Sequence, residues 1–274
     1  MTAIRIAFFF SAIGTPLAAQ WVNQPTPGTP RTRDGKANLT APAPRLNGKP
    51  DLTGLWQAER TSEQELTSLL GKEVVSLQID PQDFTKNVMN LFWGVKPEEE
   101  PLTPAGAAAY KRHQAEEDHW PHTQCLPAGI PGDLFVLAFK IVQAPREILM
   151  LTEIASPTRQ IYTDGRSLPK DPEPTYMGYS VGRWQGDTLL VETSGFKDGE
   201  WLDGFGHARS ESMLITERYR RRDFGHMDLE IAFDDAKYYT RPFTVKAALR
   251  LIPDSDILEY VCPENEKDRV HLGK

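Results

Sequence analysis

From residue 134 to residue 261 the chain alternates between apolar and polar side chains with a period of two, and this alternation constrains the fold most. Met227, Leu229 and Ile231 share one parity, whereas Asp228 takes the other. Successive side chains of a β-strand point to opposite faces, so this pattern predicts strands with one buried face and one wet face. Such strands are typical of antiparallel sheets.

The same alternation predicts nine strands in the C-terminal half. They lie at residues 134–143, 147–154, 159–164, 178–184, 188–194, 211–221, 226–233, 243–251 and 256–261. Tight turns such as Gln185-Gly186-Asp187 join neighbouring segments. One more short strand is expected at Trp56, after the turn in PDLTGLW. Strands that follow one another in this way predict a meander.

A meander of this length must close on itself or leave two unprotected edges, and closure removes the edges. We therefore expect a mainly β fold, an antiparallel up-and-down barrel, in a single domain over residues 51–268. A sandwich of two sheets is the alternative. The interior of a barrel with about eight to ten strands is either filled by side chains or holds one small ligand.

The N-terminal half has a different character. Residues 20–50 contain six prolines and no apolar periodicity, which predicts an extended or disordered lead-in. Residues 60–120 predict a helical or irregular insertion, with a short helix from Glu63 to Leu70 and a weak strand at 73–79. The clearest helix should begin after Thr103 as N-cap, with Pro104 at its first position, and end near residue 118.

The first residues, MTAIRIAFFFSAIGTPLAAQ, show an early charge, a short apolar run and small residues before Gln20. This pattern is typical of a secretory signal peptide, expected at residues 1–19, and the apolar run is too short for a membrane-spanning helix. The expected location is therefore periplasmic or extracellular.

Charge and composition restrict the partners. The chain has 31 Lys and Arg against 38 Asp and Glu, a formal charge of −7, which gives no basic stripe for nucleic acid. No later apolar run is long enough to span a membrane. A small-molecule ligand is the expected partner, and the sequence leaves the oligomeric state open.

Export also affects the interpretation of the two cysteines, because an oxidising compartment lets thiols pair. Cys125 and Cys262 are expected to form a disulfide, with two separate buried thiols as the alternative. His119, His122 and Cys125 have a spacing that some metal sites use, but a structural zinc site needs a fourth ligand. The sequence therefore predicts no metal and no cofactor.

Five motifs carry a resemblance to known proteins: PDLTGLW, YTDGR, MGYSVGRWQGDTLLVETSGF, TERYRRRDFGH and YYTRPFTV. Over about residues 50–268 the chain resembles a functionally uncharacterised family of secreted bacterial proteins. The Gly-x-Trp at the head of a β-meander is also similar to the lipocalin and wider calycin barrels. This second resemblance implies a calycin-like barrel that binds small apolar ligands, and neither resemblance implies a catalytic residue.

Several residues are candidates for ligand binding. Arg166 follows Asp164 and Gly165 in a sequence that suits a hairpin turn, yet its planar fork also matches a carboxylate, with Asp164 holding it in place. The aromatic candidates are Tyr179, Trp184, Trp201 and Phe205. The last two lie in the glycine-rich loop 196–210, whose length is typical of a lid or site loop.

Three residues are candidates for acid–base catalysis. His207 in that loop and Glu211 four residues later provide the minimum for proton transfer near neutral pH. Glu217 shares its parity with Met213 and Ile215, so if these two face inward it is a charge inside the barrel, which must be paired, protonated or functional. Arg241 and Lys246 are its candidate partners. The GYSVG sequence does not have the spacing of a serine nucleophile elbow.

Two classes of function follow from these residues. The first is an exported barrel protein that binds an apolar or amphiphilic small molecule, with Arg166 and Glu217 as polar anchors and the 196–210 loop as lid. The alternative is a barrel enzyme, a hydrolase, lyase or isomerase, that uses His207 with Glu211 or Glu217. A role in envelope structure is a third possibility. Convergence of His207, Glu211 and Arg166 in one concave site would favour the enzyme.

Overall fold

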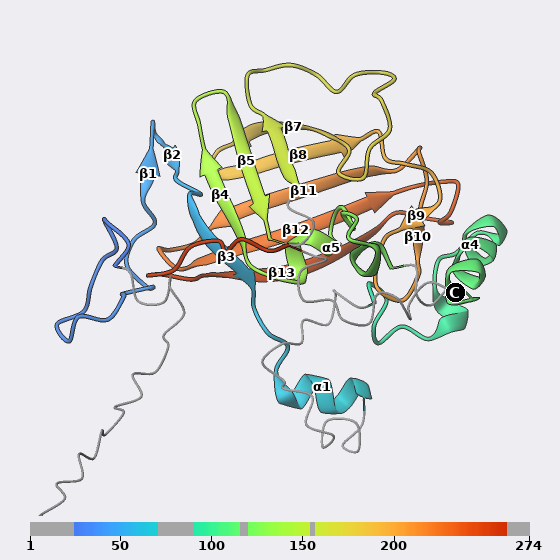
Figure 1. Cartoon of the computed structure of the whole chain (residues 1–274), viewed down its shortest axis with the longest axis horizontal. Helices are drawn as coiled ribbons and strands as arrows, with labels where there is room; N and C mark the ends of the chain where they lie inside the picture. The colour runs from blue at the N-terminus through green and yellow to red at the C-terminus, as the bar shows by residue number, and fades with distance from the viewer. Residues whose placement is uncertain (1–24, 71–89, 116–119, 154–156, 262–274) are drawn as a thin grey trace, which may run out of the picture.

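The computed structural model describes residues 25–70, 90–115, 120–153 and 157–261 (Figure 1). These residues form a mainly β structure built around a closed barrel of nine strands, which confirms the predicted fold class. The barrel strands are β3 (Gly54–Ala58), β4 (Phe139–Gln143), β5 (Glu147–Thr152), β6 (Thr158–Tyr162), β7 (Tyr179–Gln185), β8 (Thr188–Ser194), β11 (Leu214–Arg221), β12 (His226–Asp234) and β13 (Phe243–Leu251).

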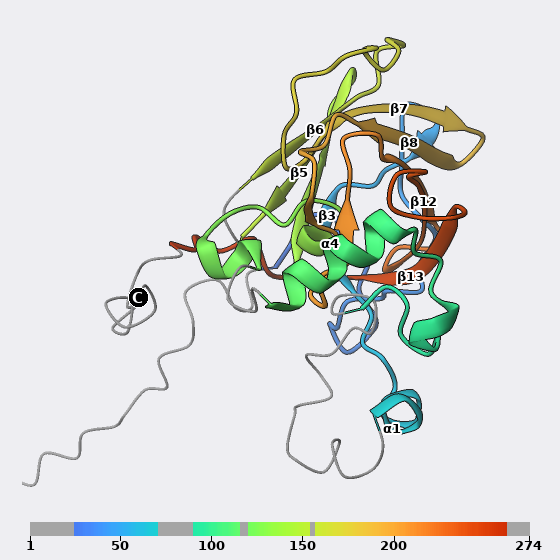
Figure 2. The same ribbon diagram turned by 90° about the vertical axis from the view of Figure 1, so that its right-hand side faces the viewer.

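Each barrel strand pairs with the next one along the chain, and β13 closes the ring on β3. A ring of nine strands cannot alternate direction throughout, because nine is odd, so one neighbouring pair must be parallel. That pair is β6 and β7, joined through only two residue pairs, Ile161 with Ser180 and Tyr162 with Val181. Parallel neighbours need a long connection. Here it is the loop 163–178, which projects at the top of Figures 1 and 2.

The parallel joint differs from the purely antiparallel expectation because one predicted strand is missing. Residues 256–261, all within the described part of the chain, form no strand. The place beside β13 is already occupied, since β13 pairs with β12 on one side and with β3 on the other. Residues 132–135 also differ from prediction. The predicted strand would begin at residue 134, but this segment forms a helical turn, α5 (Gly132–Phe135). Leu134 and Phe135 are both buried, whereas a strand with one wet face would bury only one of two consecutive side chains.

The barrel interior is filled by inward-facing side chains. Tyr219, Phe139 and Phe233 are almost completely buried. Trp56 is also buried and donates its indole N–H to the carbonyl of Leu52 at 2.9 Å. The interior therefore resembles a packed core more than a lumen.

A long insertion separates β3 from β4. It contains α1 (Glu63–Leu70), the 3-10 turns η2 (Pro97–Glu99) and η4 (Pro121–Gln124), and α4 (Pro104–Ala115) before α5. The expected start of α4 is confirmed, because the Thr103 hydroxyl accepts the N–H of Gly106 at 3.1 Å. Gly106 is pressed against Tyr238, where an added Cβ would lie 2.1 Å from the carbonyl oxygen. The helix α4 contacts the short strand β10 (Ala208–Arg209), and Figure 1 shows both on the same side of the barrel.

The segment predicted as a disordered lead-in has defined contacts over residues 25–50. It contains a small antiparallel ladder of β1 (Arg45–Leu46) and β2 (Lys49–Pro50). Arg31 forms an ion pair with Asp254, and Arg45 forms one with Asp187. The physical reason is that paired charges and backbone hydrogen bonds to residues 224–225 replace the apolar periodicity that the segment lacks.

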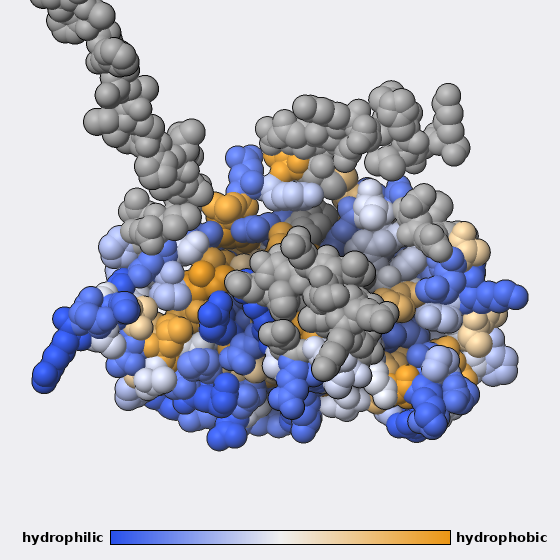
Figure 3. Space-filling view, turned by 90° about the horizontal axis from the view of Figure 1, so that it is seen from below, coloured by the Kyte–Doolittle hydropathy of each residue, from blue (hydrophilic) through white to orange (hydrophobic). Residues whose placement is uncertain are grey.

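The signal peptide predicted at 1–19 and the strand predicted at 73–79 fall outside the described residues, and so does Cys262 of the predicted disulfide. The disulfide between Cys125 and Cys262 therefore stays a prediction. No helix in the described ranges combines the length and apolar character needed to cross a bilayer. In the view from below, hydrophilic residues predominate along the lower edge and hydrophobic residues form separate patches (Figure 3).

Candidate functional site

The parallel joint leaves a cleft in the barrel wall. Because the ladder of β6 with β7 begins only at Ile161, the earlier part of β6 has no β7 partner on that side. A hollow of about 350 Å³ lies there, which we call the seam cleft. Its described lining contains no Asp or Glu. The lining residues are Pro127, Thr158, Arg159, Gln160, Tyr162, Thr175, Tyr176, Met177, Gly178, Tyr179 and Ser180.

One wall of the seam cleft is aromatic. The rings of Tyr162 and Tyr179 lie 5.2 Å apart, between centroids. The guanidinium of Arg166 covers the Tyr162 ring at 3.8 Å and donates to the Tyr179 hydroxyl at 3.0 Å. On another side of the cleft the Lys197 ammonium lies 4.1 Å from the centroid of the Tyr176 ring. Arg166 and Lys197 thus contact all three tyrosines that line the cleft.

The structure places Arg166 next to the seam cleft but already paired with a carboxylate. Its Nε donates to Asp164 Oδ1 at 2.9 Å and its Nη2 to Asp164 Oδ2 at 2.6 Å. Hydrogen bonds from Arg166 lower the pKa of Asp164 to about 2. Gly165 between them has φ +89°, as the predicted turn requires. Arg166 therefore positions the aromatic wall, while its fork is occupied.

The inner side of the seam cleft meets a polar cluster buried in the barrel. Arg159 lines the cleft and pairs with Glu217, with 3.0 Å between Nη1 and Oε1. Arg159 Nε also donates to the Ser180 hydroxyl at 3.1 Å, and its Nη2 to the Thr193 hydroxyl at 2.9 Å. The Tyr219 hydroxyl donates to Glu217 at 2.5 Å. Every polar group in this cluster has a partner.

The charge predicted inside the barrel is therefore paired, but its partner differs from both candidates. Lys246 lies on the outer face and bonds with Glu230 instead. Arg159 shares its parity with the inward-facing Ile161, so the alternation contained the signal that identifies it. Burial lowers the pKa of Arg159, yet the Glu217 carboxylate outweighs this and raises that pKa above its usual value.

His207, the main catalytic candidate, is completely buried between two carboxylates. Its Nδ1 lies 2.6 Å from Asp203 Oδ2, and its Nε2 lies 3.2 Å from Glu100 Oε2. Burial lowers the pKa of His207, but Asp203 and Glu100 outweigh burial and raise this pKa to about 9. The Tyr110 ring stacks on the imidazole, with 4.7 Å between ring centroids. An imidazolium held in this way links the 196–210 loop to the insertion between β3 and β4, which contains Glu100.

Asp203 organises the same loop through its backbone. Its Oδ1 accepts the N–H groups of Phe205, Gly206 and His207, each at 3.1 Å. Its Oδ2 accepts the N–H of Leu91 at 2.9 Å. The 196–210 loop is thus fastened to the insertion by a buried carboxylate and a buried histidine, and His207 has no surface open to a substrate.

The three catalytic candidates have separate partners. Glu211 bonds with Lys237, with 2.8 Å between Oε2 and Nζ. Glu217 belongs to the Arg159 cluster, and His207 belongs to the Asp203 cluster. The structure therefore does not bring His207 and Glu211 together, and Arg166 bonds with a third set of residues.

The remaining aromatic candidates lie away from the seam cleft. Trp184 packs against the barrel core. Trp201, in the short strand β9 (Glu200–Trp201), is buried and stacks on His113 with 4.6 Å between ring centroids. Phe205 is partly exposed beside Trp93, with ring centroids 6.4 Å apart. Of the predicted binding residues, Tyr179 lines the cleft, and Arg166 and Asp164 adjoin it.

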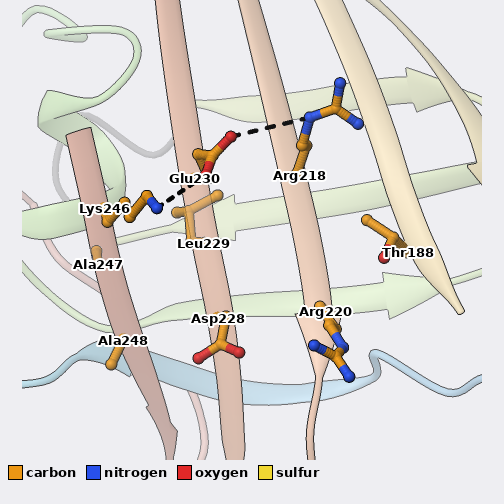
Figure 4. Close-up of a pocket in the computed structure, with 9 residues that line it drawn as sticks. All are labelled: Thr188, Arg218, Arg220, Asp228, Leu229, Glu230, Lys246, Ala247 and Ala248. Atoms are coloured by element: carbon orange, nitrogen blue, oxygen red, sulfur yellow. Dashed lines mark ion pairs between the residues drawn. The ribbon is translucent and has the colours of Figure 1, made fainter. Parts of the chain in front are cut away.

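A larger hollow of about 600 Å³ lies on the outer face of the barrel (Figure 4). We call it the outer-face hollow; it is lined by Thr188, Arg218, Arg220, Asp228, Leu229, Glu230, Lys246, Ala247 and Ala248. Glu230 on β12 lies between Arg218 on β11, at 4.0 Å, and Lys246 on β13, at 3.4 Å. Its charges of opposite sign lie across neighbouring strands, as on an ordinary solvated sheet face. This hollow has no aromatic lining among the described residues.

Comparison of the chain with protein-family models, with curated proteins and with solved structures found no match. The resemblances drawn from the sequence motifs therefore extend no further than the barrel itself.

Proposed function

We propose that this chain is an exported barrel protein that binds a small amphiphilic molecule in the seam cleft rather than inside the barrel. The observation that carries the proposal is the lining of the cleft. Three tyrosines provide apolar ring faces, Thr, Ser and Gln side chains provide hydrogen bonds, and Arg159 is the one charged lining residue described.

The size of the seam cleft fits this proposal. Its volume of about 350 Å³ is at the lower end of the ~300–1,000 Å³ that is usual for small-molecule sites. Such sites combine apolar and aromatic walls with a few fixed polar groups. Here Arg166 and Lys197 fix Tyr162, Tyr179 and Tyr176, so the aromatic walls are preorganised, which lowers the entropic cost of binding.

Binding is tested by filling the cleft. Thr158 lines the seam cleft and Thr188 lines the outer-face hollow, so Thr158→Trp and Thr188→Trp are matched variants. Titration calorimetry with 4-propylbenzamide, a neutral amphiphile, should show binding to the wild type and to Thr188→Trp. Thr158→Trp should weaken the binding of 4-propylbenzamide by at least about tenfold, or roughly 1.4 kcal/mol, because the indole takes the place in which the ligand would bury its apolar surface.

Two results would overturn the proposal. One is the absence of binding by 4-propylbenzamide, 4-propylphenol and 4-propylbenzoate alike. The other is equal binding by the wild type and Thr158→Trp, because the ligand would then lie elsewhere. Export is tested separately by cell fractionation of the full chain and of a chain without residues 1–19, and the proposal requires that only the full chain leaves the cytoplasm.

A further inference from the structure

One buried arginine has donors that no described residue satisfies. Arg209 lies in the short strand β10 (Ala208–Arg209) and has no exposed surface. Its Nη1 donates to the carbonyl of Ala128 at 2.8 Å. Its Nε and Nη2 have no hydrogen-bond partner within the described part of the chain. The Phe196 ring lies 5.3 Å from the guanidinium carbon and provides only a partial replacement for a polar partner.

The other buried arginines are satisfied. All three side-chain nitrogens of Arg159 donate hydrogen bonds. Those of Arg221 donate to the backbone carbonyls of Asp51, Asp223 and Phe224. A buried N–H without a partner has lost its water and gained nothing, so native proteins rarely leave one in place. The edge of Arg209 therefore stands out within the same molecule.

The two unsatisfied nitrogens define the shape of the missing partner. Nε and Nη2 are on the same edge of a guanidinium, and their N–H bonds point the same way. That edge accepts the two oxygens of a carboxylate through two parallel hydrogen bonds. A single carbonyl or hydroxyl oxygen cannot satisfy both donors equally well.

The two carboxylates whose charges act on Arg209 do not fill this place. Asp133 is used by others, because it bonds with His122 at 2.7 Å and accepts the N–H of Gly129 at 2.7 Å. Glu200 acts on Arg209 only through space. Burial outweighs both carboxylates and lowers the pKa of Arg209 to about 10, as expected for a cation with no bonded counter-charge.

Arg209 lies directly behind one wall of the seam cleft. Pro127 lines the cleft, and the next residue, Ala128, accepts the Arg209 hydrogen bond. Gly129 has φ +77°, and a Cβ added there would lie 2.9 Å from Nη2. The same Cβ would lie 2.5 Å from the carbonyl oxygen of Tyr176, another cleft residue. One layer of chain thus separates the guanidinium from the cleft.

We propose that Arg209 is the anchor for a carboxylate on the ligand of the seam cleft, so that the ligand is an aromatic or aliphatic carboxylic acid. This inference rests on the proposed function and names the charged group of its ligand. Because Arg209 is covered, the ligand must displace the cover formed by residues 127–129, where the glycine at position 129 has the backbone freedom for such a change. Arg166 does not take this role, since Asp164 already occupies its fork.

The test compares two ligands of nearly equal shape, 4-propylbenzoate and neutral 4-propylbenzamide. Calorimetry on the full-length protein should show that the wild type prefers the benzoate by at least about tenfold, as expected for two charge-assisted hydrogen bonds. Arg209→Gln should abolish this preference while the benzamide binds as before. Arg209→Lys, which keeps the charge but not the fork, should retain only a small preference. The exposed Arg183→Gln is the control for net charge and should behave like the wild type.

The outcomes separate this inference from the proposed function. A wild type that binds both ligands equally overturns the carboxylate anchor but leaves the amphiphile site intact. The same conclusion follows if Arg209→Gln keeps the preference. Absence of binding by both ligands overturns this inference, and it overturns the proposed function as well if 4-propylphenol also fails to bind. If both Arg209 variants fail to fold, the Glu200→Gln variant provides the second test. It removes a carboxylate whose charge acts on Arg209, so the benzoate should bind more tightly, and unchanged or weaker binding would overturn the inference.

Discussion

Arg159 and Arg209 are both almost completely buried, but their surroundings differ. Arg159 sits inside the barrel, where the strand ladders fix the positions of Glu217, Ser180 and Thr193 around it. Arg209 lies in the 196–210 loop, outside the barrel ladder, and makes one hydrogen bond. Buried charges are normally paired. The fold itself therefore satisfies the first arginine, whereas two donors of the second have no hydrogen-bond partner among the described residues.

This difference also bears on where a ligand belongs. A barrel suggests a binding site in its interior, but the interior here is filled by side chains such as Trp56 and Phe233 and by the Arg159 cluster. The odd number of strands instead opens the wall at the parallel joint. The seam cleft therefore lies at the parallel joint that a closed ring of nine strands requires.

The largest effect should come from breaking the satisfied cluster. Glu217→Ala leaves Arg159 buried without its carboxylate, and we expect it to lower the free energy of unfolding by about 3–5 kcal/mol. Urea denaturation followed by circular dichroism measures this. The double variant Arg159→Met with Glu217→Met should recover most of the loss. A loss below about 1 kcal/mol for Glu217→Ala would contradict the role assigned to this pair.

The next effect is the pH dependence of stability that His207 gives to the 196–210 loop. The folded pKa of His207, about 9, lies above its ordinary value of 6.5, so its contribution to stability is fully present below pH 6.5. That contribution is lost as the pH rises through 9. The difference corresponds to about 3 kcal/mol.

Unfolding free energies measured from pH 6 to pH 10 test this prediction. The wild type should become less stable over this range by more than the His207→Gln variant does. Parallel curves for the two proteins would show that His207 is not held as an imidazolium.

A smaller effect is expected at Arg209 in the absence of ligand. Arg209→Met removes a buried cation that has one hydrogen bond, so we expect the free energy of unfolding to change by no more than about 1 kcal/mol in either direction. Arg159→Met, the matched change, should cost several times as much because it leaves Glu217 unpaired. Equal losses for the two variants in urea denaturation would remove the contrast between the two arginines.

The smallest effect should come from an exposed ion pair on the outer face of the barrel. Arg183 on β7 bonds with Glu192 on β8 at the surface. Arg183→Ala should change stability by less than about 1 kcal/mol, and salt should reduce the effect further. A larger loss that persists in high salt would mean that the contrast between buried and exposed pairs does not hold in this barrel.

Much of the fold follows from local patterns, whereas the site does not. The alternation predicts the barrel strands and the inward position of Glu217, because parity depends only on neighbouring residues. The parallel joint depends on whether the number of strands in the ring is odd or even. The ring has nine strands, one fewer than the sequence predicts, because residues 256–261 form no strand. Arg209 has no periodic neighbours, so its burial arises only when the loop, Gly129 and Tyr176 come together.

The most direct test is an NMR titration of the wild-type protein with 4-propylbenzoate, observing the Nε–H resonances of the arginines. Arg209 should shift strongly and saturate with the dissociation constant that calorimetry gives, while the Arg159 resonance moves little. If the ligand binds and the Arg209 resonance stays in place, its carboxylate lies elsewhere and the account of this arginine is wrong.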